Sequence, residues 1–190
     1  STDAWFYPAV RWAYRTGLVS GTSETTFDPE APITRQDFAL ILYTQSGSPA
    51  MTGSVLRDFP DVEQVSGYAY AALTWAVEQG LIGGVGDGFF GPEDVVLYEQ
   101  GIKVAMVCIG ETVQFDPDTT NWVAANITRA EEIGLTDDLA GAPGELLHCD
   151  DFAVLADRIV EILAERAADE AAAAATAAVP QTTTTSAPKA

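Results

Sequence analysis

The sequence predicts an all-α protein built from repeats of one helix–loop–helix unit. The main observation is an internal repeat, because residues 7–30 align with residues 70–93 without a gap, at an offset of 63. Of the 24 aligned positions 10 are identical, and they include the aromatic, Ala and Gly-Leu positions of a helix and its end. The second observation is apolar residues at helical spacing, followed by a glycine that can end the helix. A repeat of this length predicts several copies that share one core.

The first copy contains two predicted helices. Apolar residues at positions 6, 9, 10 and 13 predict a helix from Trp5 to Thr16. A second helix is expected to begin at Thr34, since Asp37 three residues later completes a pattern close to a capping box.

The second copy has the same order of elements, and a third copy is weaker. Phe59-Pro60-Asp61-Val62 marks the start of the second copy, and helices are expected over 68–79 and 98–109. An offset of 117 relates Trp122 to the start of the first copy, and the last helix is expected from Asp150. We therefore divide the chain into a first repeat at 1–54 that is clipped at its N-terminal side, a second repeat at 55–112, a degenerate third repeat at 113–166, and an Ala/Thr-rich tail or linker at 167–190.

The charge balance excludes several classes of partner. The chain has 28 Asp and Glu against 9 Lys and Arg, which gives a net charge of −19. Nucleic acids and anionic membranes are bound through clustered cations, so neither is an expected partner. We see no apolar run of about 18 residues that would span a bilayer. The sequence also shows no nucleophile–base pair and no metal-ligand cluster, so we predict no catalytic residue, no metal and no cofactor. Cys108 and Cys149 are left as either a disulfide or two separate thiols.

The motifs together resemble a known family. Phe-x-Asp-Val, an aromatic-rich helix ending in Ala-x3-Gly-Leu-x2-Gly, then Phe-x-Pro, then Ile-Thr-Arg before a second helix, resemble the S-layer homology repeat over about residues 1–165. The resemblance implies three such repeats in a pseudo-threefold arrangement around a central three-helix bundle. It implies an extracellular location at the cell wall or cell surface of a bacterium. The implied partner is a secondary cell-wall polysaccharide, often pyruvylated, that is held non-covalently in grooves between repeats by a non-catalytic anchoring module.

The arginine of the family's ligand motif survives in one copy. The motif, Thr-Arg-Ala-Glu at the start of the second helix, is Thr34-Arg35-Gln36-Asp37 in the first copy. The other copies read Leu97-Tyr98-Glu99-Gln100 and His148-Cys149-Asp150-Asp151. We expect Arg35, beside the free N–H groups of a helix start, to bind a carboxylate. The alternative is an ion pair with Asp37 or a neighbouring carboxylate. One competent groove is therefore predicted rather than three.

Aromatic residues and glycines complete the candidate site. Trp5, Tyr68 and Trp122 occupy equivalent positions, where they could stack on a sugar ring or pack between repeats. The loop glycines could let a ligand approach the backbone or could serve only the turn. The candidate ligand-binding residues are Arg35, Trp5, Thr34, Gly21, Tyr68, Gly84, Gly88 and Trp122.

Two functions from different classes follow from these observations. The first is a wall-anchoring module whose main charged contact is Arg35. The second is a structural scaffold that has lost polymer binding and contacts another domain or subunit of the same surface protein. The two missing arginines and the net charge of −19 motivate the second function.

Overall fold

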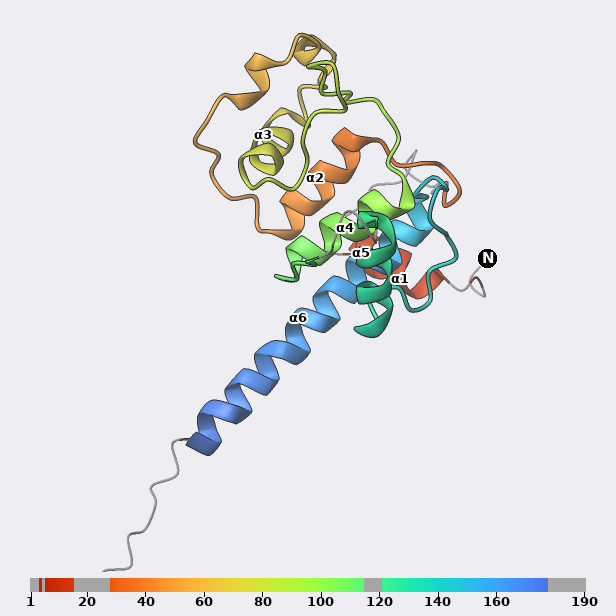
Figure 1. Ribbon diagram of the computed structural model, residues 1–190, viewed down its shortest axis with the longest axis vertical. Helices are drawn as coiled ribbons and strands as arrows, with labels where there is room; N and C mark the ends of the chain where they lie inside the picture. The colour runs from red at the N-terminus through yellow and green to blue at the C-terminus, as the bar shows by residue number, and fades with distance from the viewer. Residues whose placement is uncertain (1–3, 5, 16–27, 115–120, 178–190) are drawn as a thin grey trace, which may run out of the picture.

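The computed structural model describes residues 4, 6–15, 28–114 and 121–177 (Figure 1). These residues form six α-helices and two short 3-10 helices, and they contain no β-strand, so the predicted all-α class is confirmed. The helices are α1 (Tyr7–Arg15), α2 (Arg35–Gln45), η1 (Val55–Asp58), η2 (Val62–Gln64), α3 (Tyr70–Glu78), α4 (Tyr98–Cys108), α5 (Trp122–Glu132) and α6 (Cys149–Ala177).

The predicted start of the second helix is confirmed by its cap. Thr34 has extended backbone geometry, and its hydroxyl accepts a hydrogen bond from the Asp37 N–H at 3.3 Å. The same hydroxyl donates to the Asp37 carboxylate at 2.7 Å. These two bonds fix the first turn of α2. The first helix of the second copy begins later than predicted, at Tyr70, because a turn from Ser66 to Ala69 precedes it.

Three short segments before α2, α4 and α6 form a closed ring of backbone hydrogen bonds. The Ile33 N–H donates to the Leu147 carbonyl at 3.0 Å, the Leu147 N–H to the Val96 carbonyl at 2.8 Å, and the Val96 N–H to the Ile33 carbonyl at 3.0 Å. All three residues are buried. The ring joins equivalent positions of the three copies, so the second helix of every copy begins at one common point.

Next to this ring, the first N–H group of each of these helices also donates to a carbonyl of a neighbouring copy. The N–H of Arg35 donates to the Asp94 carbonyl at 2.9 Å, that of Tyr98 to Glu145, and that of Cys149 to Ala31 at 3.0 Å. The donors at the start of each helix have no partner within the helix. Each copy thus depends on its neighbour to satisfy them.

The first helices pack in a cyclic order. Helix α3 packs on α2, α5 packs on α4, and α1 packs on α6, so the first helix of each copy lies on the second helix of another (Figure 1). Helix α4 also contacts α6. The Phe38 and Phe152 rings meet edge to face, 5.1 Å between centroids, and join α2 to α6 in the core. Full pseudo-threefold symmetry around a three-helix bundle stays a prediction.

Helix α6 is much longer than the other helices. It runs from Cys149 to Ala177, and its C-terminal half extends away from the rest of the fold (Figure 1). Arg166 holds its middle to the fold by donating to the Ile109 carbonyl at 2.6 Å and to Glu111 at 2.5 Å. Part of the predicted tail, residues 167–177, therefore continues this helix. Among the described residues, no helix has the length and apolarity needed to cross a membrane. Cys108 and Cys149 are separate thiols.

Candidate functional site

Three of the predicted site residues line one cavity between the copies. Arg35 from the start of α2, Gly84 from the loop after α3, and Trp122 from the start of α5 line a cavity of about 280 Å³ together with one face of α4 and neighbouring residues. The cavity thus takes residues from all three copies. Its lining residues are Arg35, Phe38, Gly80, Leu81, Ile82, Gly83, Gly84, Val96, Gln100, Lys103, Val104, Val107 and Trp122.

The Arg35 guanidinium is held by the second copy. Its Nη2 donates to the Gly83 carbonyl, and its Cζ lies 5.0 Å from the centroid of the Phe90 ring. Burial lowers the pKa of the guanidinium, and Asp94 and Asp61 oppose this effect. The group stays charged, because arginine does not lose its proton in proteins. Its Nε is buried without a hydrogen-bond partner among the described residues.

The structure answers two questions that the sequence left open for Arg35. Within the described part of the chain it has no carboxylate within 4.0 Å, so the alternative of an ion pair with Asp37 is wrong. The expectation of free backbone N–H groups beside it is also wrong. The N–H of Arg35 is bonded to Asp94, and the N–H of Gln36 donates to the Pro92 carbonyl at 3.1 Å. These donors are used by the neighbouring copy, so positive charge for a ligand must come from side chains.

Asp61 positions the aromatic platform under Arg35. Its buried carboxylate accepts the Phe90 N–H at 2.9 and 3.2 Å and the Gly91 N–H at 2.8 Å. Burial by itself would raise the pKa of this carboxyl, but the two N–H donors and the Arg35 charge outweigh it and lower the pKa. Sequence reasoning placed Asp61 only as a marker of the repeat start and missed this role.

Gly84 is required by close packing. A Cβ atom at this position would lie 2.9 Å from the Phe89 carbonyl oxygen and 3.2 Å from the Phe59 ring. Gly88 has a φ of 81° in the turn that brings Gly86 to Phe89, and it does not line the cavity. Gly84 therefore lines the cavity, whereas Gly88 forms part of the turn.

Lys103 is a second cation in the cavity that the sequence analysis missed. Its Nζ lies over the Trp122 ring, 5.2 Å from the centroid. Lys103 and Gln100 are one helical turn apart on α4, and this spacing is the only signal that could have placed them on one face. No Asp or Glu lines the cavity, so Arg35 and Lys103 are the only charged residues in its described lining.

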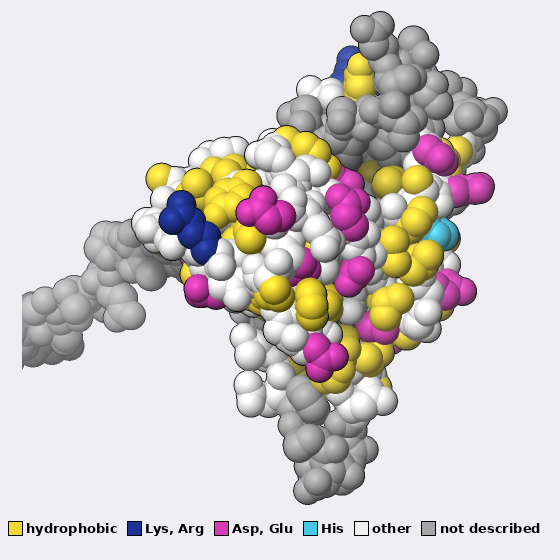
Figure 2. Space-filling view, turned by 90° about the horizontal axis from the view of Figure 1, so that it is seen from above, with side chains coloured by type: hydrophobic (Ala, Val, Ile, Leu, Met, Phe, Trp, Pro, Cys, Tyr) yellow, Lys and Arg dark blue, Asp and Glu magenta, His cyan; other side chains and the backbone are white. Residues whose placement is uncertain are grey.

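This cavity is unusual for so acidic a chain. On the face shown in Figure 2, acidic side chains are scattered across the surface, whereas cationic side chains occur at only a few points. By contrast, Arg129, Arg158 and Arg166 each form ion pairs with carboxylates. The cavity with Arg35 and Lys103 therefore differs from the surroundings of these arginines, because no carboxylate lines it.

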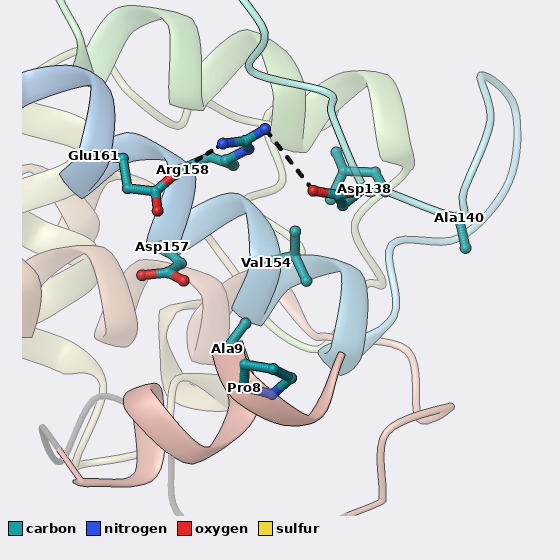
Figure 3. A pocket seen from close by; sticks show the side chains of 9 residues that line it. Pro8, Ala9, Asp138, Ala140, Val154, Asp157, Arg158 and Glu161 are labelled. Atoms are coloured by element: carbon teal, nitrogen blue, oxygen red, sulfur yellow. Dashed lines mark hydrogen bonds and ion pairs between the residues drawn. The ribbon is translucent and has the colours of Figure 1, made fainter. Parts of the chain in front are cut away.

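The equivalent cavity of the next copy has a different charge pattern. It has a volume of about 450 Å³ and lies between α1, α6 and the loop at 138–140 (Figure 3). Its cation, Arg158, donates to Glu161 at 2.8 Å and to Asp137 at 3.2 Å, and lies 3.9 Å from Asp138. Arg158 is therefore surrounded by carboxylates, which disfavour an anionic ligand.

The residues that replace arginine in the other copies carry no positive charge. Tyr98 is buried, and burial, followed by Asp151 and Glu131, raises its pKa to about 12. Burial and neighbouring carboxylates raise the pKa of the Cys149 thiol to about 11. Both groups are neutral at pH 7.

The remaining predicted site residues lie away from the cavity or cannot be placed. Thr34 caps α2, and the exposed Tyr68 donates its hydroxyl to Asp37 at 2.8 Å. Neither lines the cavity with Arg35. Trp5 and Gly21 lie outside the described residues.

The profile of the S-layer homology domain matches residues 1–39 and 58–100. A cell surface protein of Thermoanaerobacter kivui is 25% identical over 163 residues, which are 84% of this chain and 20% of that protein. An endoglucanase of Bacillus sp. (strain KSM-635) is 29% identical over 103 residues, which are 54% of this chain and 10% of that protein. The chain thus spans a fifth or less of the length of these relatives. The first and the second copy of the repeat thus each match the S-layer homology domain, over residues 1–39 and 58–100.

Proposed function

We propose that this chain anchors a surface protein to a bacterial cell wall by holding an anionic wall glycopolymer in the cavity lined by Arg35. Both copies of the repeat that match the S-layer homology domain belong to a kind of domain that binds cell-wall polymers, and a relative of the chain is a cell surface protein. The observation that carries the proposal is the described lining of this cavity, whose only charges are the two cations Arg35 and Lys103.

The chemistry of Arg35 suits a carboxylate on a sugar, such as a pyruvate ketal. A planar guanidinium can bind a carboxylate with two parallel hydrogen bonds. The Gly83 carbonyl and the Phe90 ring already fix the orientation of the guanidinium, so little side-chain entropy is lost on binding.

Trp122 supplies an apolar surface next to this charge. Its ring lines the same cavity and lies beside the Lys103 ammonium. An aromatic ring can pack on the apolar face of a sugar while the cations bind the acidic group. Gly84 has no side chain, so the loop after α3 does not fill this part of the cavity. We assign Thr34, Tyr68 and Gly88 to the support of the fold, while the roles of Trp5 and Gly21 stay predictions.

One groove of this kind is proposed for the chain. The cavity with Arg158 would bring an anionic ligand close to Asp137, Asp138 and Glu161, and this repulsion disfavours binding. We expect each protein molecule to hold one polymer chain.

The chain itself is proposed to be non-catalytic. S-layer homology domains anchor proteins and do not catalyse reactions. The endoglucanase relative is matched over a tenth of its length, so its activity is not transferred to this chain.

The proposal is tested by co-sedimentation with purified bacterial cell walls. The wild-type chain should sediment with intact walls and not with walls from which the secondary polymer has been chemically removed. Arg35→Ala should lose most of the binding, because it removes one of two cations. Arg57→Ala is the matched control, since Arg57 is exposed on η1 and the substitution changes the net charge equally.

Three results would contradict the anchoring proposal. They are unchanged binding by Arg35→Ala, equal loss in Arg57→Ala, and no binding by the wild-type chain. The last result would favour the alternative function, a scaffold for contacts with another domain or subunit.

A further inference from the structure

The outer side of the backbone ring carries an exposed apolar patch. The three ring residues are buried, and side chains alternate along paired extended segments, so the residue before each ring residue faces outward. These outward residues occupy equivalent positions of the three copies, and all are apolar and exposed: Pro32, Val95 and Leu146. Because the ring holds their segments together, we treat them as one surface, the ring patch.

Carboxylates surround the ring patch. Its three segments, residues 28–34, 91–97 and 142–151, contain no Lys or Arg. Their acidic residues are Asp28, Glu30, Glu93, Asp94, Glu145, Asp150 and Asp151. On the face shown in Figure 2, hydrophobic side chains gather beside the histidine of the chain, with acidic side chains around them. The patch therefore combines an apolar centre with a negative rim.

A pocket opens at the Leu146 side of the ring patch. It has a volume of about 480 Å³ and lies between the loop at 140–148 and the start of α6. Leu146 is its apolar wall, and its described lining includes three carboxylates, those of Glu145, Asp150 and Asp151, but no Lys or Arg. The ring patch thus continues into a concave site with negative charge.

Asp150 is a nearly buried carboxylate of this pocket without a countercharge. The residue is only 9% exposed, and its Oδ1 accepts the Asp151 N–H at 2.8 Å. Its Oδ2 accepts no hydrogen bond from the described residues, and no Lys or Arg nitrogen among them lies within 4.0 Å. Burial, together with the charge of Asp151, raises the pKa of Asp150, although the Asp151 N–H and His148 oppose this. A cation in the pocket would offset the cost of burying this charge.

We propose that the ring patch docks a basic segment of a partner protein, with one lysine side chain of that segment in the pocket. The aliphatic stem of the lysine lies along Leu146, and its ammonium faces Glu145 and Asp150. A lysine suits the site better than an arginine, because one oxygen of Asp150 is already bonded and a two-pronged guanidinium needs both. Apolar residues beside the lysine cover the ring patch.

Other occupants fit the described surface less well. A second copy of this chain would bring two equal sets of carboxylates together, and their repulsion disfavours such a pair. Among the described residues, no group of acidic, His or Cys side chains is arranged to hold a metal ion. The surface does not include the cavity with Arg35, so the proposal goes beyond wall binding.

The test is an NMR titration of the whole chain at physiological salt with the peptide acetyl-Ala-Leu-Lys-Leu-Ala-amide. The signals of Leu146 and His148 should shift. The same peptide with norleucine in place of lysine should bind about tenfold more weakly, as the loss of one charge-assisted hydrogen bond would give. Asp150→Asn should cause a similar loss, whereas Asp169→Asn, the same change on the exposed part of α6, should cause none.

A second variant keeps the test valid if Asp150→Asn does not fold. Glu145→Gln removes an exposed charge of the pocket, and its amide oxygen can still accept the Ala142 N–H. It should weaken binding of the lysine peptide several-fold and leave binding of the norleucine peptide unchanged.

Four results would overturn the docking proposal. They are no shift at Leu146 and His148, equal binding of the two peptides, equal effects of Asp150→Asn and Asp169→Asn, and binding of putrescine as tight as that of the lysine peptide. The last result would show a site for small amines that does not use the ring patch. Co-sedimentation of Glu145→Gln with cell walls should equal that of the wild type, so failure of this proposal is distinguishable from failure of the anchoring function.

Discussion

Replacement of Asp61 should lower the free energy of unfolding by about 3 kcal/mol, because its carboxylate accepts hydrogen bonds from two backbone N–H groups. Asp61→Ala removes the acceptor of the Phe90 and Gly91 N–H groups, and Phe90 is fully buried. An unsatisfied buried donor costs about 1–3 kcal/mol, so two donors predict a loss near 3 kcal/mol in the free energy of unfolding. The same change releases the loop that carries the platform under Arg35.

The measurement is urea unfolding at pH 7 followed by tryptophan fluorescence. With a denaturant slope of about 1–3 kcal/mol/M, the loss should move the midpoint down by about 1–3 M. Asp58→Ala is the control, because Asp58 lies three residues earlier, is exposed, and removes the same charge. A midpoint for Asp61→Ala equal to that of the control would refute the assignment of these two hydrogen bonds.

The dependence of stability on pH gives a second check on Asp61. Its folded pKa lies below its unfolded pKa, so its contribution is full above the unfolded value of about 3.9 and is lost as the pH falls through the folded value. Wild-type stability should therefore fall more steeply below about pH 4 than that of Asp61→Asn. Parallel acid titrations of the two proteins would contradict the lowered pKa.

Two further substitutions test other contacts. Gly84→Ala places a methyl group 2.9 Å from the Phe89 carbonyl oxygen, so we expect a lower melting temperature and weaker wall binding, whereas Gly83→Ala, which meets no atom within 4 Å, should melt normally. Equal melting of the two variants would show that the loop relaxes freely. Glu111→Gln removes the charge that holds two arginines and should lower the melting temperature at pH 7, with the difference from the wild type shrinking as the pH falls through the lowered pKa of Glu111. A difference that grows towards acid pH would reverse this sign.

Local features of the sequence predicted much of the fold. Thr34 and Asp37 lie three residues apart, so the cap at the start of α2 could be read directly from the chain. The offset of 63 relates Arg35 at the start of α2 to Tyr98, and α4 begins at Tyr98. The exact start of α3 was less accessible, because the turn before it has no capping side chain.

The site was only partly predictable, because its chemistry depends on contacts between copies. Arg35 was identified from its motif, but its partners Gly83 and Phe90 are distant in sequence. Lys103 carries no motif, and its contact with Trp122 depends on the packing of α5 on α4. The backbone donors at the start of α2 were wrongly expected to be free, since their acceptors belong to the second copy.

The composite construction of the cavity means that the repeats are not interchangeable modules. Arg35 comes from the first copy, the loop with Gly84 from the second, and Trp122 from the third. Deleting any single copy would remove part of the cavity and also open the backbone ring through Ile33, Val96 and Leu147. The third copy has diverged in sequence, yet it still contributes one wall of the cavity whose charge lies in the first. A shortened chain with two copies is therefore expected to lose the whole site rather than a third of the binding.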